Sequence, residues 1–328
     1  MKLAVLGSGA WGTALATMLA GGSEVGSDHP VVLWGRDAQV IEEINRDHRN
    51  STYLGDIALS PNLLATTELA QVAQADIVLC VTPAQTFGQI AEQLKPHLSY
   101  KASVVLCAKG IDRSTGQLLH QLATDALGED AVAALSGPSF ATDVAKGLPT
   151  AVSLAAVSMQ KATDLAAALS RARFRIYATD DLVGVEIGGA LKNVLALAVG
   201  IARGLQLGAS AEAALIARGF AELSRVATAQ GARSDTLAGL SGLGDLVLSC
   251  SSPQSRNFSY GMALAAGEDL TNRPLAEGVH TAEMALKMAQ HNGIEAPIIA
   301  AITQVLAGDV TPGEAVQMLL QRPLKGEV

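Results

Sequence analysis

The chain begins with a glycine-rich stretch, VLGSGAWG, in which Gly7, Gly9 and Gly12 follow a short apolar run at residues 2–6. Because glycine has no β-carbon, the backbone can turn tightly there, and a helix that begins at the turn offers unpaired N–H groups to an anion. Between a first strand and a first helix, this spacing is typical of dinucleotide binding. The stretch therefore favours an N-terminal Rossmann-type domain, and it requires strands and helices to alternate after it.

The first half of the chain shows this alternation. Short β-branched runs predict strands at residues 2–6, 31–34, 77–81, 103–107, 132–135, 151–154 and 174–177. Helical stretches lie between them, such as those at residues 12–19, 38–45 and 85–94. Several strands are continuously apolar, which is typical of strands buried on both faces of a mainly parallel sheet. We therefore predict an α/β fold with a doubly wound Rossmann-type domain.

The second half contains helical patterns and no predicted strand. Gly-, Ser- and Pro-bearing turns separate expected helices at residues 183–207, 212–230, 259–266, 281–291, 297–307 and 312–320. We expect a dinucleotide-binding Rossmann domain over residues 1–180 and an all-α substrate and catalytic domain over residues 181–328.

Composition excludes several classes of partner. The formal net charge is −8 and no run of Lys or Arg occurs, which argues against nucleic acid or an anionic membrane surface. Cys80, Cys107 and Cys250 show no metal-ligand or redox spacing, so we expect no metal and reduced thiols in a cytoplasmic protein. The apolar run at residues 2–20 could pass for a signal peptide, but its glycines favour a soluble fold without stable membrane insertion. The oligomeric state stays open, a homodimer included.

The end of the second predicted strand bears on the choice of dinucleotide. The sequence VVLWGRD places Arg36 where a carboxylate would hold the ribose 2′-hydroxyl of NAD. Arginine instead suits a 2′-phosphate, so we expect both cofactors to be used, with NADPH ahead of NADH. Asp37 complicates this, unless its side chain turns away to cap the next helix. The alternative is an ordinary surface arginine.

Lys192 is the most unusual position of the helical half, because EIGGALKNVLALAVGIARG otherwise predicts a buried helix. A buried ammonium loses hydration and is costly. The face that carries Lys192 also carries Gly188, Ala196, Val199 and Arg203, so another body could approach the amine closely. The alternative is a lysine that extends its stem to the surface.

Other polar positions recur at turns. Lys109 in CAKGI and the group Gly137, Ser139 and Ala141 in SGPSFA follow successive strands, at the sheet edge where ligands bind. Asp245 in LSGLGDL is isolated among small residues and could simply cap a helix. Ser255-Arg256-Asn257 precedes a helix expected near residue 258, and an arginine with small polar donors there is typical of a phosphate site. Glu277-Gly278 in LAEGVHTA precedes another helix, where a plain helix cap is the better interpretation of this segment taken alone.

Together these stretches resemble the bacterial-type NAD(P)-dependent glycerol-3-phosphate dehydrogenase family. The stretches GSGAWGTALA, CAKGI, SGPSFA, EIGGALKNVLALAVGI, LSGLGDL, SRN and AEGVHTA occur in order from residue 7 to residue 282. The resemblance implies reversible reduction of dihydroxyacetone phosphate to sn-glycerol 3-phosphate with NADH or NADPH, which supplies phospholipid synthesis. Ala10 departs from the serine that relatives commonly carry.

The resemblance also implies residue roles. It makes Lys192 the catalytic acid/base, with Lys109 and Asp245 beside the reacting carbon. The substrate would contact Lys109, Gly137, Ser139, Lys192, Asp245, Ser255, Arg256 and Asn257. The dinucleotide would contact Gly7, Gly9, Ala10, Trp11, Gly12, Arg36, Lys109, Ala141, Arg256, Leu275 and Glu277. Two alternatives stay open: another hydroxyacid dehydrogenase with a helical C-terminal domain, and a dinucleotide-sensing module without catalysis.

Overall fold

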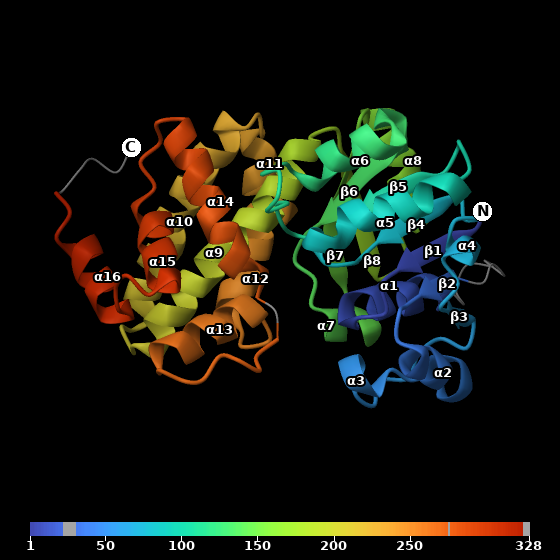
Figure 1. Cartoon of the computed structure of the whole chain (residues 1–328), viewed down its shortest axis with the longest axis horizontal. Helices are drawn as coiled ribbons and strands as arrows, with labels where there is room; N and C mark the ends of the chain where they lie inside the picture. The colour runs from blue at the N-terminus through green and yellow to red at the C-terminus, as the bar shows by residue number, and fades with distance from the viewer. Residues whose placement is uncertain (22–30, 275, 324–328) are drawn as a thin grey trace. The chain divides into compact units, whose positions relative to one another are not determined.

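A computed structural model describes residues 1–21, 31–274 and 276–323 of the chain (Figure 1). The described chain forms two compact units, Met1–Glu186 and Ile187–Val328. The division falls inside one long helix, α9 (Leu182–Gly204), a few residues after the boundary expected from the sequence.

Unit 1 is built on a sheet with the strand order β3-β2-β1-β4-β5-β6-β7-β8. All neighbouring strands are parallel except β6 and β7, which are antiparallel. The strands are β1 (Leu3–Leu6), β2 (Val31–Trp34), β3 (Leu63–Thr66), β4 (Ile77–Cys80), β5 (Ser103–Leu106), β6 (Val132–Ser136), β7 (Thr150–Ala156) and β8 (Phe174–Thr179). This confirms the doubly wound, mainly parallel sheet.

The sequence analysis missed β3. This strand is short and lies at the edge of the sheet, and its central residue Leu64 is about half exposed. It therefore lacks the continuous apolar run that identifies the central strands.

Helices connect the strands of unit 1. They are α1 (Ala10–Ala20), α2 (Ala38–Asp47), α3 (Ser51–Leu54), α4 (Leu69–Val72), α5 (Phe87–Leu94), α6 (Leu119–Leu127), α7 (Ala141–Ala145) and α8 (Met159–Leu169). Three 3₁₀ turns, η1 (Ala84–Thr86), η2 (Lys95–His97) and η3 (Glu129–Ala131), complete the connections.

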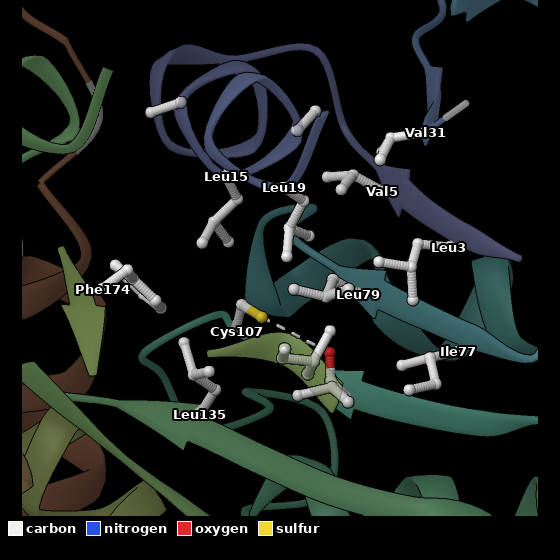
Figure 2. Close-up of a cluster of buried hydrophobic side chains, with 14 of the residues drawn as sticks. Leu3, Val5, Leu15, Leu19, Val31, Ile77, Leu79, Cys107, Leu135 and Phe174 are labelled. Atoms are coloured by element: carbon white, nitrogen blue, oxygen red, sulfur yellow. Dashed lines mark hydrogen bonds between the residues drawn. The ribbon is translucent and has the colours of Figure 1, made fainter. Parts of the chain in front are cut away.

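Two apolar clusters bury the two faces of the sheet, because side chains alternate along each strand. Leu3 and Val5 of β1 belong to one cluster, which Leu15 and Leu19 of α1 help to form. Figure 2 shows these α1 side chains pointing toward the strands. Ala4 and Leu6, which share the opposite face of β1, belong to the other cluster, with residues of α4, α5 and α6. Burial on both faces fixes the register, since a shift by one residue would exchange the two sets.

Unit 2 consists of helices and connecting turns, with no strand among its described residues. After α9 come α10 (Ala209–Ala229), α11 (Ser234–Ala238), a π-helical turn η4 (Leu240–Gly244), α12 (Asp245–Ser251), α13 (Arg256–Ala265), α14 (Glu277–His291), α15 (Pro297–Ala307) and α16 (Pro312–Leu320). The last two match the expected ranges. The sequence analysis missed α11, η4 and α12, and it placed the starts of α13 and α14 a few residues too late.

Helix α9 is long and apolar enough to cross a membrane by those criteria alone. However, 89% of its most apolar window is buried inside the protein. Its hydropathy is therefore explained by its place in a protein core.

Glu222 of α10 supports the start of α15, and we expect it to be important for stability. Its buried carboxylate accepts hydrogen bonds from the N–H groups of Ile298 and Ile299, at 3.0 and 3.3 Å. In Glu222→Ala both donors lose this acceptor and a cavity remains, so we expect the free energy of unfolding to fall by about 2–3 kcal/mol. Urea unfolding measures the change, and Glu222→Gln, which keeps one acceptor, should lose less.

The same carboxyl group should make stability depend on pH. Burial raises the pKa of Glu222 above its ordinary value of 4.5. The contribution of the Glu222 carboxyl group to the free energy of unfolding is therefore largest below its unfolded-state pKa. It decreases as the pH rises through the folded-state pKa. As the pH rises from the unfolded-state pKa through the folded-state pKa, wild type should lose stability relative to Glu222→Gln. A difference in unfolding free energy that stays constant with pH would contradict a raised pKa of Glu222.

Candidate active site

The glycine-rich turn after β1 needs glycine at two positions for different reasons. Gly7 has a φ of +125°, which side-chain-bearing residues rarely adopt. A β-carbon on Gly12 would lie 1.8 Å from the carbonyl oxygen of Gly7, so only glycine lets α1 begin this close to the turn. Gly9 is the N-cap of α1 and has no side chain to occupy the helix N-terminus. Ala10 and Trp11 form the first turn of α1, which leaves its N-terminal N–H groups available to an anion.

The tip of β2 carries Arg36 and Asp37, and both are exposed. The Asp37 carboxylate accepts hydrogen bonds from the N–H groups of Gln39 and Val40, at 2.9 and 3.4 Å. Asp37 is therefore the N-cap of α2, as the sequence predicted, and its charge is engaged by the helix.

Lys109, Gly137 and Ser139 come together in unit 1, at the carboxyl ends of β5 and β6. The Lys109 ammonium donates to the Gly137 carbonyl oxygen at 3.1 Å, and the Ser139 hydroxyl donates to the same oxygen at 3.0 Å. A β-carbon on Gly137 would lie 2.8 Å from the α-carbon of Val152. Ala141 follows as the first residue of α7. The loop after β6 therefore holds a lysine and a hydroxyl side by side.

Lys192 is buried and paired, so the interpretation as a lysine reaching the surface is wrong. Its side chain is 8% exposed, and its ammonium donates to Asp245 at 3.0 Å and to the Ser249 hydroxyl at 2.5 Å. Asp245 and Ser249 lie one turn apart on α12, and both are buried. A buried ammonium is retained here because a carboxylate and a hydroxyl replace its lost hydration.

Gly188, on the same face of α9 as Lys192, lets the backbone of η4 in the same unit approach closely. A β-carbon on Gly188 would lie 3.2 Å from the carbonyl oxygen of Ser241 and 3.3 Å from the α-carbon of Gly242. These two residues belong to η4, which leads directly into Asp245. The close approach of η4 to α9 thus brings the carboxylate to the amine.

Asn257 joins three helices. Its amide nitrogen donates to the side-chain oxygen of Asn193 at 2.9 Å, and its oxygen accepts from the N–H group of Gly278 at 2.9 Å. Because Asn257 and Asn193 are buried, this network fixes the start of α13 against α9 and α14. Glu277, the first residue of α14, is adjacent.

Ser255 and Arg256 form the start of α13. The expectation of a helix beginning near residue 258 is corrected here, since Ser255 is the N-cap and its hydroxyl accepts from the N–H group of Phe258 at 3.4 Å. Arg256 is exposed and lines a cavity of about 190 Å³ together with Arg273 and Tyr260. The cavity offers the Arg256 guanidinium and the Tyr260 phenol to an anionic ligand, whereas the Arg273 guanidinium donates to Glu268 and Ser259.

The thiols near these groups are not nucleophiles. Burial raises the pKa of Cys250 to about 12, although the nearby Lys192 ammonium opposes the shift. Burial likewise raises the pKa of Cys107, next to β5. Both thiols are therefore neutral at physiological pH.

The structure places the predicted residues in two groups, one in each unit. Leu275 lies outside the described residues. Sequence reasoning missed Ser249, although its spacing of four residues from Asp245 on a helix could have indicated it. It also missed Asn193, a polar residue next to Lys192 inside an apolar helix.

Both units of the chain match known proteins. Two family models match the chain, the N-terminus of NAD-dependent glycerol-3-phosphate dehydrogenase over residues 2–163 and its C-terminus over residues 181–317. Glycerol-3-phosphate dehydrogenase [NAD(P)+] of Brucella ovis is 54% identical over 327 residues, which cover 99% of each chain.

Solved structures show the same similarity. The glycerol-3-phosphate dehydrogenase of Coxiella burnetii matches with a TM-score of 0.91 and 38% identity, over 98% of this chain and 99% of that one. The enzyme of Saccharomyces cerevisiae matches with a TM-score of 0.82 and 28% identity, over 97% of this chain and 99% of that one.

Proposed function

Because the chain belongs to the NAD-dependent glycerol-3-phosphate dehydrogenase family, we propose that it reversibly reduces dihydroxyacetone phosphate to sn-glycerol 3-phosphate with NADH or NADPH. The observation that carries the proposal is the buried Lys192–Asp245–Ser249 group, in a chain that also has the glycine-rich turn. The product supplies the backbone of glycerophospholipids.

The residues of unit 1 fit a dinucleotide. Gly7, Gly9 and Gly12 form the tight turn, and the N-terminus of α1 receives the pyrophosphate. In this proposal Ala10, Trp11, Arg36, Lys109 and Ala141 line the remainder of the dinucleotide, and roles for Arg256, Leu275 and Glu277 follow from the family resemblance alone. When bound, the reduced nicotinamide supplies a hydride to the substrate carbonyl carbon.

Lys192 is the proton donor in this proposal. The ammonium gives a proton to the substrate carbonyl oxygen as that oxygen becomes an alkoxide, and it takes the proton back in the reverse direction. Asp245 and Ser249 hold the amine in one position, because each accepts one of its hydrogens. In this proposal Lys109, whose ammonium donates to the Gly137 carbonyl oxygen as the Ser139 hydroxyl does, supplies a second positive charge to the developing alkoxide.

Arg256 reads the phosphate end of the substrate. A guanidinium offers two parallel donors to a phosphate, and Ser255 and Asn257 flank it at the start of α13. This distinguishes a phosphorylated ketone from an unphosphorylated one.

The direct test is the loss of reduced-nicotinamide absorbance when dihydroxyacetone phosphate is added to the purified protein. Turnover is expected with NADPH and with NADH. Turnover of a 2-oxo acid instead would favour another hydroxyacid dehydrogenase, and cofactor binding without turnover would favour a sensing module. Family membership argues against another hydroxyacid dehydrogenase, and the paired Lys192 and Asp245 argue against a sensing module without catalysis.

Arg36→Ala should reduce the use of NADPH selectively. Arg36 is exposed at the tip of β2, and Asp37 is engaged as the cap of α2, so no carboxylate opposes a 2′-phosphate. Loss of a charge-assisted contact should lower kcat/KM for NADPH by about tenfold and leave NADH nearly unchanged. The comparison is kcat/KM with both cofactors in both proteins. An unchanged ratio would show that Arg36 does not read the 2′-phosphate.

We also propose a cytoplasmic location, with a homodimer as one candidate for the oligomeric state. The net charge of −8 and three buried free cysteines support the first. Fractionation of cells tests the location, and light scattering of the purified protein tests the dimer.

A further inference from the structure

A fully buried asparagine braces the glycine-rich turn from outside it. Asn50 is the N-cap of α3, far from the turn in sequence, and both it and Thr13 of α1 are 0% exposed. The Asn50 amide nitrogen donates to the Ser8 carbonyl oxygen at 3.0 Å and to the Thr13 hydroxyl at 2.8 Å. The Thr13 hydroxyl donates in turn to the Ser8 carbonyl oxygen at 3.2 Å. These three residues form a closed triangle of hydrogen bonds, which we call the Asn50 brace.

The chemistry of the partners fixes how the Asn50 amide is oriented. The Ser8 carbonyl can only accept, so the NH₂ group of Asn50 must face it. The hydroxyl hydrogen of Thr13 is directed to the same carbonyl, so the hydroxyl oxygen accepts the second hydrogen of Asn50. The Asn50 side-chain oxygen is left without a partner among the described residues. The brace therefore uses both N–H donors of Asn50 and not its side-chain oxygen.

The brace orients one peptide plane of the turn. In a planar trans peptide the C=O and N–H groups point in opposite directions. Two donors hold the Ser8 carbonyl toward Asn50 and Thr13, so the N–H group of Gly9 points in the opposite direction, away from both residues.

The room around Gly9 also differs from the room around the Ser8 side chain. A β-carbon placed on Gly9 would meet nothing within 4 Å, whereas one on Gly35 of the β2 tip would lie 2.1 Å from the Ser8 hydroxyl oxygen. The Ser8 side chain therefore packs closely against the tip of β2, whereas a β-carbon on Gly9 would have room.

We propose that Asn50 and Thr13 are positioning residues for dinucleotide binding, which hold the Ser8–Gly9 peptide so that its N–H group is presented to the pyrophosphate. The inference rests on the proposed function of the glycine-rich turn. It adds two residues that do not touch the cofactor and act only through the Ser8 carbonyl. Their removal should weaken cofactor binding without affecting the substrate or the proton transfer.

The test compares two substitutions at one position: valine has nearly the shape of threonine, and serine is smaller by one methyl group. Thr13→Ser keeps the hydroxyl, and Thr13→Val removes it. We expect the dissociation constant for NADPH, measured by calorimetry, to rise about five- to tenfold in Thr13→Val and to stay near wild type in Thr13→Ser. At saturating NADPH, kcat and the KM for dihydroxyacetone phosphate should stay within about twofold of wild type.

Asn50→Ala provides the second arm. It removes both donors, so its dissociation constant should be at least as high as that of Thr13→Val. The double variant should be little weaker than Asn50→Ala alone, because both changes break the same triangle. Additive losses, or a lower melting temperature with an unchanged dissociation constant in Thr13→Val, would overturn the proposal and leave the brace a stability feature.

Gly9→Ala separates this inference from the proposed function. The added methyl group meets no protein atom within 4 Å and the φ of Gly9 is −71°, so the fold should tolerate alanine. Weaker NADPH binding in Gly9→Ala, with no change in Thr13→Val, would retain the turn as the binding site and reject the brace. Unchanged binding in Gly9→Ala would reject the turn itself.

Discussion

Lys192→Met is expected to lower kcat by about two to four orders of magnitude, because one positioned proton donor typically contributes that much. Methionine keeps the length and apolar character of the stem and removes only the ammonium. The NADPH dissociation constant should change little, since the glycine-rich turn lies in the other unit. Stopped-flow or steady-state oxidation of NADPH measures kcat, and calorimetry measures the binding.

A loss of stability must be separated from a loss of chemistry. Lys192→Met leaves Asp245 as a buried carboxylate without its ammonium partner, which is destabilising in itself. Lys192→Met combined with Asp245→Asn removes that charge, and kcat should stay low while the melting temperature recovers. Lys287, an exposed lysine paired with Glu283 in the same unit, is the matched control, and Lys287→Met should keep normal kcat. Near-normal kcat in Lys192→Met would reject its role as proton donor.

Arg256→Ala is expected to raise the KM for dihydroxyacetone phosphate by about ten- to a hundredfold. Hydrogen bonds to a charged group contribute about 1.5–3 kcal/mol, and alanine removes all of them. Unphosphorylated dihydroxyacetone has no such contact to lose, so its kcat/KM should change far less. The experiment measures kcat/KM for both substrates in wild type and variant.

The same cavity provides the control for Arg256. Arg273 lines it too, but its guanidinium is engaged by Glu268 and by the Ser259 hydroxyl. Arg273→Ala should therefore raise the KM much less than Arg256→Ala. Equal effects on the phosphorylated and unphosphorylated substrates in Arg256→Ala would show that this arginine serves the cofactor or the fold instead.

Local patterns determine a large part of this fold. The run at residues 31–34 and the helical pattern at residues 312–320 predict β2 and α16 with their observed bounds, because strand and helix patterns depend on near neighbours in the chain. Asp37 as the cap of α2 follows from the same kind of signal. The glycine spacing at residues 7–12 predicts the turn, since steric limits on the backbone are local.

Only the tertiary structure decided the partners of the polar side chains. Asp245 and Ser249 lie 53 and 57 residues from Lys192, and Asn50 lies 37 residues from Thr13. The sequence alone identifies Lys192 as a charged residue in an apolar helix and Asp245 as an isolated carboxylate, but it does not show that the two side chains meet. Their meeting depends on η4 packing against Gly188, a close approach set by helices that are far apart in the chain. Such pairings follow from how elements pack, and packing is a property of the folded chain as a whole.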